Sequence, residues 1–272
     1  MVGSFLSAVA GTRGMYKSGD AAMPIRLVVV DIDGCLTPGE GHSAHLDVLR
    51  EIQDINARSR TDPAVPAVTL CTGRQQPFVE LMCQLIGAYR PAIFENGAGL
   101  YDPEAYEFHA HPQITPDMIQ SLRSVKLLIE EHIVRKRVAK IQPGKEFSLS
   151  LYPVAPHTVA ETAALMRNLC DRNGLRFFMD ESIMCVNVLF PGIDKGAGVR
   201  WLASNLGMPL ADIAGVGDAD GDLTYLNIVG FSAAPANATA SVRARAAFVA
   251  TSENGHGTLE ILREIIRRNK AT

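Results

Sequence analysis

Four short strings of residues, spread along the chain, carry the side chains that could do chemistry. They supply two adjacent carboxylates, a hydroxyl, an ammonium group and a second acidic cluster. A carboxylate can attack phosphorus as a nucleophile, a second one can move a proton, and carboxylate oxygens bind hard divalent cations. The set therefore predicts transfer of a phosphoryl group through an aspartyl intermediate. The strings are Asp31-Ile32-Asp33-Gly34, Thr72-Gly73-Arg74, Asp194-Lys195-Gly196 and Gly217-Asp218-Ala219-Asp220-Gly221-Asp222.

The first string follows a predicted buried strand. Residues 27–30 are apolar and mostly β-branched, which is typical of a strand covered on both faces of a parallel sheet. Asp31 and Asp33 therefore lie at the carboxyl edge, where open α/β sheets bind ligands. Gly34 allows a sharp turn whose amide hydrogens can meet an anion. Two solvated aspartates are the alternative, but such close carboxylates repel unless a cation lies between them or one is protonated.

The second string follows another short apolar run. Residues 68–71 predict a strand, and Thr72 and Gly73 can donate hydrogen bonds to a phosphoryl oxygen. Because Thr-Gly-Arg is also common as a simple link between a strand and a helix, this string carries weight only together with the others.

The third and fourth strings contribute opposite charges. Lys195 precedes a helical pattern that ends at Gly207, and its ammonium can hold a phosphate dianion, although a surface charge is the common alternative. Residues 213–216 predict a third strand, and the acidic residues crowded directly after it indicate a hard-cation site. A solvated turn stays the alternative for Asp220, whose side chain need not point inward.

In this order the strings resemble the haloacid dehalogenase-like phosphatase superfamily. Its pattern is Asp-x-Asp-Gly-x-Leu, then Thr or Ser after the second strand, then Lys, then Gly-Asp-x-x-x-Asp. The resemblance covers nearly the whole chain, from Pro24 to about Arg267. The matching positions are Asp31–Leu36, Thr72, Lys195 and Gly217–Asp222.

Two positions depart from the superfamily pattern. Gly221 stands where members with a type-two cap often carry Asn, so we expect one polar contact near the phosphate or the lysine to be missing. Cys35 fills a variable position where Thr is frequent. Since no hydroxyl is needed there, we attach no catalytic role to the thiol.

The resemblance implies a role for each matched residue. Asp31 would attack phosphorus, while Asp33 would protonate the leaving alcohol and then deprotonate the attacking water. Asp222 would orient Lys195 or a metal-bound water. The implied catalytic residues are Asp31, Asp33, Thr72 and Lys195. The implied substrate-binding residues are Gly34, Gly73, Arg74, Asn96 and Lys195. The implied Mg²⁺ ligands are Asp31, Asp33 (through its backbone carbonyl), Asp218 and Asp222.

The chain is predicted to fold as a core with an inserted cap. Its 272 residues suit one full domain plus a smaller one. Residues 24–98 and 191–272 alternate strands and helices, and the resemblance implies a doubly wound, Rossmann-like α/β core with a mainly parallel sheet. Residues 99–190 contain the unit helix–strand–strand twice, which predicts an α+β cap that can close over the site. Residues 1–23, rich in Gly, Ser and Ala, predict a flexible extension, with a weak targeting signal as the alternative.

Periodicity and capping residues place the helices and strands. Core helices are expected at 44–57, 77–86, 238–245 and 258–268, the last after a turn at 254–257. Cap helices are expected at 115–132 and 158–173, and cap strands at 138–142, 147–152, 176–179 and 184–190. Thr158 and Glu161 form a capping box. This small cap is similar to the type-two cap of archaeal-type phosphoglycolate phosphatases and sucrose-phosphate phosphatases.

A few further residues are weaker candidates. His109 and His111 share one face of a predicted strand and could bind a metal ion, but a solvated strand edge is favoured because no third ligand is spaced nearby. Near the last helix, His256 could reach the edge of the site. Substrate contacts from the cap have three candidates, which are Lys145, Ser148 and Ser150.

Composition and charge exclude several classes of protein. A net charge of -3 gives no basic footprint for nucleic acid. No apolar run approaches the roughly 18–20 residues that span a bilayer, which argues against membrane-pumping ATPases that share aspartyl phosphorylation. The 5 cysteines include no Cys-x-x-Cys pair, so we expect a reducing, cytoplasmic setting. The expected partner is a small phosphorylated metabolite, and the oligomeric state stays open.

The sequence thus predicts a Mg²⁺-dependent phosphomonoesterase that acts on phosphoglycolate or a sugar phosphate. Two alternatives stay open. A phosphomutase of the same superfamily would return the phosphoryl group to a sugar, and a non-catalytic phosphate-binding protein would keep the fold without turnover. The full set of polar residues in the four strings argues against the second.

Overall fold

The computed structural model describes residues 24–272, and the predicted extension at residues 1–23 lies outside the described residues. Its centre is a five-stranded sheet in the order β12-β11-β10-β1-β2, in which all neighbouring strands are parallel. The predicted mainly parallel core is therefore confirmed. The strands are β1 (Leu27–Val30), β2 (Ala67–Leu70), β10 (Ile213–Val216), β11 (Phe231–Ala234) and β12 (Phe248–Val249).

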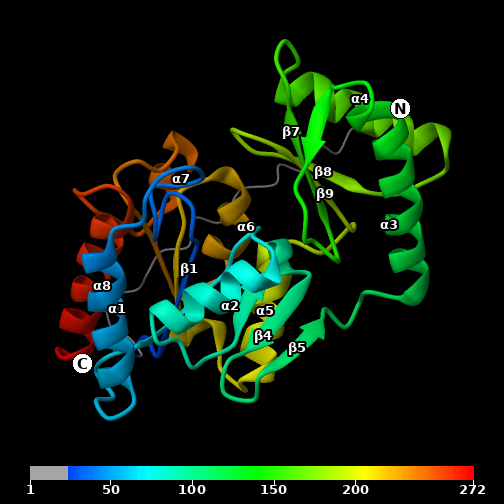
Figure 1. The fold of residues 1–272 in the computed structure, drawn as a ribbon. Coiled ribbons are helices and arrows are strands. Elements are labelled where there is room, and N and C mark those ends of the chain that lie inside the picture. Colours follow the sequence, from blue (N-terminus) through cyan, green and yellow to red (C-terminus); the bar gives the residue numbers. More distant parts are fainter. Residues whose placement is uncertain (1–23) are drawn as a thin grey trace, which may run out of the picture.

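Helices cover both faces of this sheet (Figure 1). Alternate residues of β1 point to opposite faces, so Val28 and Val30 belong to one buried cluster and Leu27 and Val29 to another. The first cluster lies under α1, α2 and α8, and the second under α5, α6 and α7. The apolar run in β1 follows from burial on both faces, and the doubly wound architecture is confirmed. The helices are α1 (Leu46–Ser59), α2 (Gln76–Leu85), α5 (Lys195–Asn205), α6 (Leu223–Leu226), α7 (Ala240–Arg245) and α8 (Asn254–Asn269).

A small antiparallel sheet extends the core beyond β2. It has the order β3-β4-β5 and consists of β3 (Ala92–Phe94), β4 (Gly99–Asp102) and β5 (Glu107–Ala110). A parallel bridge between Cys71 and Ile93 joins it to the end of β2. Leu100 and Tyr101 of β4 are buried in the two core clusters. The boundary between core and cap at residue 99 stays a prediction, and these contacts lead us to propose that the cap begins after β5.

The inserted cap is a four-stranded antiparallel sheet with two helices, in the order β6-β7-β9-β8. Helix, strand and strand follow one another twice along the chain, as the sequence predicted. In Figure 1 the cap stands above the core, with α3 on the side away from the core sheet. The elements are α3 (Pro116–Ile129), β6 (Ala139–Ile141), β7 (Leu149–Pro153), α4 (Val159–Arg172), β8 (Phe178–Glu181) and β9 (Val186–Leu189).

Local signals account for how the cap helices begin. The Thr115 side chain accepts a hydrogen bond from the Met118 amide at the start of α3. The predicted capping box at the start of α4 is present, because Thr158 and Glu161 each bond the other's backbone N–H. After Ile129, α3 continues as a π-helical turn to Val134. None of the helices in the described part of the chain is long and apolar enough to cross a membrane.

The cap sheet has one apolar face and one polar face. Leu149, Leu151, Val186 and Val188 are buried in a cluster with residues of α3 and α4. The residues that alternate with them point the opposite way, because successive side chains of a strand face opposite sides. On that polar side, Tyr152 donates a hydrogen bond to Glu40 of the core. The polar face of the cap sheet is therefore turned toward the core.

The prediction of a turn at residues 254–257 is wrong, because α8 begins at Asn254. A Cβ atom at Gly255 would lie 2.7 Å from the Leu36 carbonyl oxygen and 2.8 Å from a Val48 methyl. Glycine therefore lets the first turn of this helix approach the loop after β1. His256 does not reach the site, since its Nε2 lies 3.1 Å from the Asp47 carboxylate on α1.

Candidate active site

The fold brings all four strings to one edge of the parallel sheet. Asp31, Thr72 and Asp218 follow β1, β2 and β10, which are neighbours in the order β10-β1-β2. Carboxyl ends of parallel strands meet at the same edge, so these residues lie close together although they are far apart in the sequence. Lys195 is the first residue of α5, whose N-terminus is capped by the Asp194 side chain.

Lys195 links two of the carboxylates. Its Nζ lies 2.9 Å from Asp31 Oδ2 and 2.6 Å from Asp222 Oδ1. All three residues are buried, with exposed fractions of 9% for Lys195, 6% for Asp31 and 0% for Asp222. Burial alone would lower the pKa of Lys195, but Asp222 and Asp31 raise that pKa well above its ordinary value. The ammonium is therefore charged and fixed beside Asp31.

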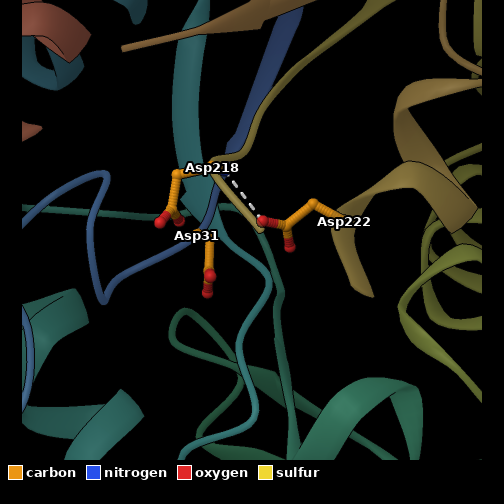
Figure 2. A group of neighbouring side chains, drawn as sticks. All are labelled: Asp31, Asp218 and Asp222. Carbon is orange, nitrogen blue, oxygen red and sulfur yellow. Dashed lines mark hydrogen bonds between the residues drawn. The ribbon is translucent and has the colours of Figure 1, made fainter. Parts of the chain in front are cut away.

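Asp222 uses both of its oxygens within the protein. Besides accepting from Lys195, it accepts the backbone N–H of Asp218 at 2.9 Å (Figure 2). It also accepts the backbone N–H of Ala219 at 3.0 Å. The loop passes so close that a Cβ atom at Gly217 would lie 2.5 Å from Asp222 Cβ. Asp222 thus contacts both the lysine and the loop that carries Asp218, and its role in orienting Lys195 stays a prediction.

Asp31, Asp218 and Asp222 form the one group of three potential metal ligands found among residues 24–272. One ligand atom from each lies within 4.8 Å of the others (Figure 2). Burial and neighbouring carboxylates raise the pKa of Asp31 to about 8, although Lys195 opposes the shift. Burial and Asp222 raise the pKa of Asp218 to about 7 in the same way. The cluster is therefore short of positive charge.

This donor set fits a hard divalent cation. Three carboxylates face one ammonium, and oxygen ligands of this kind suit Mg²⁺. Because Asp222 already accepts three hydrogen bonds, Asp31 and Asp218 are the carboxylates with most capacity left. Gly34 makes room for them: its φ is +82°, and a Cβ atom there would lie 2.2 Å from Asp218 Oδ2. The Asp33 side chain lies outside this cluster, so Asp33 could contact the cation only through its backbone carbonyl.

The Asp33 side chain is held by Arg74. Arg74 Nε donates to Asp33 Oδ2 at 2.7 Å, and Arg74 Nη2 donates to Asp33 Oδ1 at 2.6 Å. Such a two-point contact fixes the plane of the carboxylate as well as its position. Arg74 also lies 3.5 Å from Glu40. Arg74 was predicted as a substrate-binding residue, but here its guanidinium is already paired with two carboxylates.

Several polar groups near Thr72 are free to bind an anion. The Thr72 hydroxyl accepts the Arg74 N–H at 3.2 Å, so its own hydrogen is available to donate. The backbone N–H of Gly73 has no acceptor within the described residues. Asn96 is buried, and its Nδ2 likewise lacks a partner there. By contrast, the Gly34 N–H donates to the Thr37 carbonyl. Contrary to the expectation from the sequence, this amide is therefore not free to bind an anion.

The two histidine candidates are separated. His109 is exposed and pairs with Glu107 at 3.1 Å. His111 is buried and packs edge-on against Trp201, with ring centroids 5.1 Å apart. They form no metal-binding group in the part of the chain that the structure describes.

Sequence reasoning missed Glu95 of the core and Asp180 and Asn187 of the cap sheet. The buried carboxylate of Glu95 accepts the backbone N–H groups of Glu146 and Phe147 and the Ser148 hydroxyl. Asp180 and Asn187 lie on the polar face of the cap sheet and are joined at 3.1 Å. The alternation in residues 147–152 signalled such a face, but it did not say which strands pair with it.

Comparison with known proteins agrees with this geometry. The family model described as haloacid dehalogenase-like hydrolase matches residues 145–262, which include Lys195 and the acidic loop. The chain is thus similar to the haloacid dehalogenase-like hydrolases over this part of its length. The predicted resemblance of the four strings is confirmed, and the comparisons support a hydrolytic enzyme.

Curated relatives and solved structures cover nearly the whole chain. A protein of Methanopyrus kandleri named phosphoglycolate phosphatase is 27% identical over 242 residues, which is 88% of this chain and 97% of that protein. One of the same name from Pyrobaculum neutrophilum is 29% identical over 241 residues, covering 88% and 94%. The fold is similar to Thermoplasma acidophilum 0175, with a TM-score of 0.68, 19% identity and coverage of 89% and 99%. It is also similar to the sucrose-phosphatase of Synechocystis, with a TM-score of 0.65, 16% identity and coverage of 89% and 98%.

Proposed function

We propose that this hydrolase is a Mg²⁺-dependent phosphomonoesterase that acts on a small phosphorylated metabolite through an aspartyl phosphate on Asp31. The observation that carries the proposal is the contact of a buried Asp31 with Lys195, beside Asp218. This arrangement offers a nucleophile, a fixed positive charge and a cation site within one small volume. The names of the curated relatives point to the same reaction class.

Asp31 is oriented for attack by its own surroundings. Its Oδ1 accepts the Ile32 N–H at 2.8 Å, and its Oδ2 faces Lys195. A carboxylate so fixed forms a bond to phosphorus as the bond from phosphorus to the leaving oxygen breaks. A divalent cation held by Asp31 and Asp218 would keep the carboxylate ionised and would offset charge on the phosphoryl oxygens.

Asp33 supplies the proton in this scheme. It gives a proton to the leaving oxygen in the first step and takes one from the water that attacks the phosphorus of aspartyl phosphate in the second. The products are the alcohol, inorganic phosphate and the restored Asp31 carboxylate. Arg74 acts on Asp33 by fixing the direction of its carboxylate, and it must yield one oxygen during proton transfer.

Four groups of the candidate site can donate to the phosphoryl oxygens. Lys195 offers charge, while the Thr72 hydroxyl, the Gly73 N–H and the Asn96 amide offer hydrogen bonds. Fixed donors of this kind stabilise the negative charge that develops during transfer more than water can, because they need no reorganisation. Their geometry supports the predicted roles of Thr72, Gly73, Asn96 and Lys195 as phosphate ligands.

The setting of the enzyme is part of the proposal. All 5 cysteines are free and buried, as expected for a protein of a reducing compartment such as the cytoplasm. The substrate is proposed to be phosphoglycolate or a sugar phosphate, because a small cap suits a substrate with a small leaving group.

Release of inorganic phosphate tests the function directly. The purified full chain should hydrolyse p-nitrophenyl phosphate with Mg²⁺ and lose that activity in EDTA. A panel of phosphorylated acids and sugars should then identify the preferred substrate. If Mg²⁺ gives no phosphate release from any of these compounds, the proposal is wrong. Transfer of phosphate between positions of a hexose phosphate, without release, would instead indicate the phosphomutase.

A further inference from the structure

A row of polar side chains crosses the core-facing side of the cap sheet. Ser150, Asn187 and Asp180 lie directly opposite one another on β7, β9 and β8. Ser150 Oγ donates to Asn187 Oδ1 at 2.6 Å, and Asn187 Nδ2 donates to Asp180 Oδ2 at 3.1 Å. Lys145, in the loop before β7, extends the row by donating to Ser150 Oγ at 2.5 Å.

The direction of these hydrogen bonds leaves Lys145 as the charged donor with free capacity. Ser150 donates its only hydrogen to Asn187, and Asn187 Nδ2 donates one of its two hydrogens to Asp180. An ammonium has three N–H donors, and Lys145 uses one of them. Within residues 24–272, no carboxylate oxygen lies within the 4.0 Å ion-pair distance of its Nζ.

The neighbouring carboxylates are committed to other partners. Glu95 accepts three hydrogen bonds from residues 146–148, and Glu40 accepts from Tyr152 and faces Arg74. Lys145 is partly buried, and this burial lowers the pKa of its ammonium against the opposing effect of Glu95. A partly buried ammonium without a close counter-ion is unfavourable, and an anionic ligand group would relieve it.

The row spans the site from one catalytic loop to another. At one end, a Cβ atom on Gly144 would lie 3.7 Å from Gln75 Cγ, in the core loop that carries Thr72 and Arg74. At the other end, a Cβ atom on Gly221 would lie 3.9 Å from the Asp180 carboxylate. Gly221, which stands where members of the superfamily often carry Asn, thus faces the cap. The positive end of the row lies over the second string and the negative end over the fourth.

We infer that Lys145 is a specificity-determining residue, which binds a second anionic group of the substrate on the side away from the phosphate. A short phosphorylated carboxylic acid fits this arrangement, whereas a neutral sugar phosphate leaves the ammonium without its ligand. The acidic end at Asp180 repels the same carboxylate, so it fixes the substrate in one direction. This inference rests on the proposed phosphatase function.

Matched pairs of substrates test the role of Lys145. The pairs are phosphoglycolate with 2-hydroxyethyl phosphate, and 3-phosphoglycerate with glycerol 3-phosphate, which differ in one carboxylate. Steady-state kinetics are measured for the wild-type full chain, Lys145→Met, Lys145→Arg and the control Lys126→Met on the exposed side of α3. Thermal melting of each variant shows whether it is folded.

The wild type should prefer the acid in at least one pair. Lys145→Met should lower kcat/KM for that acid by about 10- to 100-fold, mainly through KM, which is the effect of one or two charge-assisted hydrogen bonds. The kcat/KM for the partner without a carboxylate should stay within about twofold of the wild-type value, since that partner makes no ion pair with Lys145. Lys145→Arg should restore part of the preference, and Lys126→Met should behave like wild type.

Other results would overturn the inference in distinguishable ways. A wild type with the same kcat/KM for the partners that lack the carboxylate as for the acids would show that no second anion is recognised. If a folded Lys145→Met loses kcat/KM equally on the acids and on the substrates without a carboxylate, Lys145 has a general structural role instead. Failure of the wild type on every compound, including p-nitrophenyl phosphate with Mg²⁺, would refute the proposed function itself.

Discussion

Replacement of Asp218 by Asn should stabilise the metal-free protein while impairing its use of Mg²⁺. Asp31 and Asp218 have pKa values of about 8 and about 7, both raised by burial from 3.8. A carboxyl whose folded pKa exceeds its unfolded pKa stabilises the fold fully below the unfolded value. That stability is lost as the pH rises through the folded pKa. Metal-free wild type should therefore become less stable between about pH 4 and pH 8.

The size of the effect follows from the same values. For Asp218, the difference between 3.8 and about 7 corresponds to on the order of 4 kcal/mol, because one pKa unit is about 1.4 kcal/mol. A chain of this size changes its Tm by about 2–4 °C per kcal/mol, so the expected rise for Asp218→Asn near pH 8 is about 10 °C. The amide fits without losing a strong contact, since within residues 24–272 the Asp218 carboxylate accepts one hydrogen bond, from the Cys35 thiol at 3.4 Å.

Thermal unfolding in EDTA at pH 5 to 8 measures this prediction. The wild-type Tm should fall with pH, the Asp218→Asn curve should be flatter and higher at pH 8, and Mg²⁺ should stabilise the wild type most at high pH. Asp54→Asn, an exposed carboxylate on α1, is the matched control and should follow the wild type. A metal-free wild type with a Tm independent of pH, or an Asp218→Asn variant no more stable at pH 8, would refute the reasoning.

Three further substitutions test other parts of the structure. Arg74→Gln should lower kcat for p-nitrophenyl phosphate by about tenfold, because Asp33 loses its two-point contact; an unchanged kcat and pH profile would contradict this positioning role. Glu95→Ala should lower the free energy of unfolding by about 3 kcal/mol in urea, since it leaves the buried Ser148 hydroxyl and two partly buried backbone amides of residues 146–147 unpaired. A loss below about 1 kcal/mol would argue against that contact. Thr158→Ala should cost about 1 kcal/mol through loss of the capping box, and no change in the urea midpoint would contradict it.

The core of the site was predictable because its signals are local. A buried apolar strand followed by Asp31, and another followed by Asp218, place both carboxylates at the same sheet edge once the strands are parallel neighbours. The contact between Lys195 and Asp31 follows from the same topology. Short-range patterns were sufficient for these residues because each lies directly at the end or the start of a regular element.

Other features depend on side-chain direction and on long-range pairing. Nothing in the local sequence says that Arg74 turns toward Asp33 instead of toward the substrate. The row from Ser150 to Asp180 needs the register of three antiparallel strands, and that register is set by packing across the whole cap. The early start of α8 likewise depends on Gly255 meeting a distant loop, which overrides its usual preference for turns.

Trapping of the phosphoryl group on Asp31 is the direct test of the proposed aspartyl phosphate. The full chain with Mg²⁺ and a good substrate is quenched in acid during turnover, and the peptide containing Asp31 is examined by mass spectrometry. We expect a phosphate adduct on that aspartate in the wild type. We also expect Asp31→Asn to melt as a folded protein and to lack both adduct and turnover. Substantial phosphate release by Asp31→Asn, or an adduct on a different residue in the wild type, would contradict the proposal.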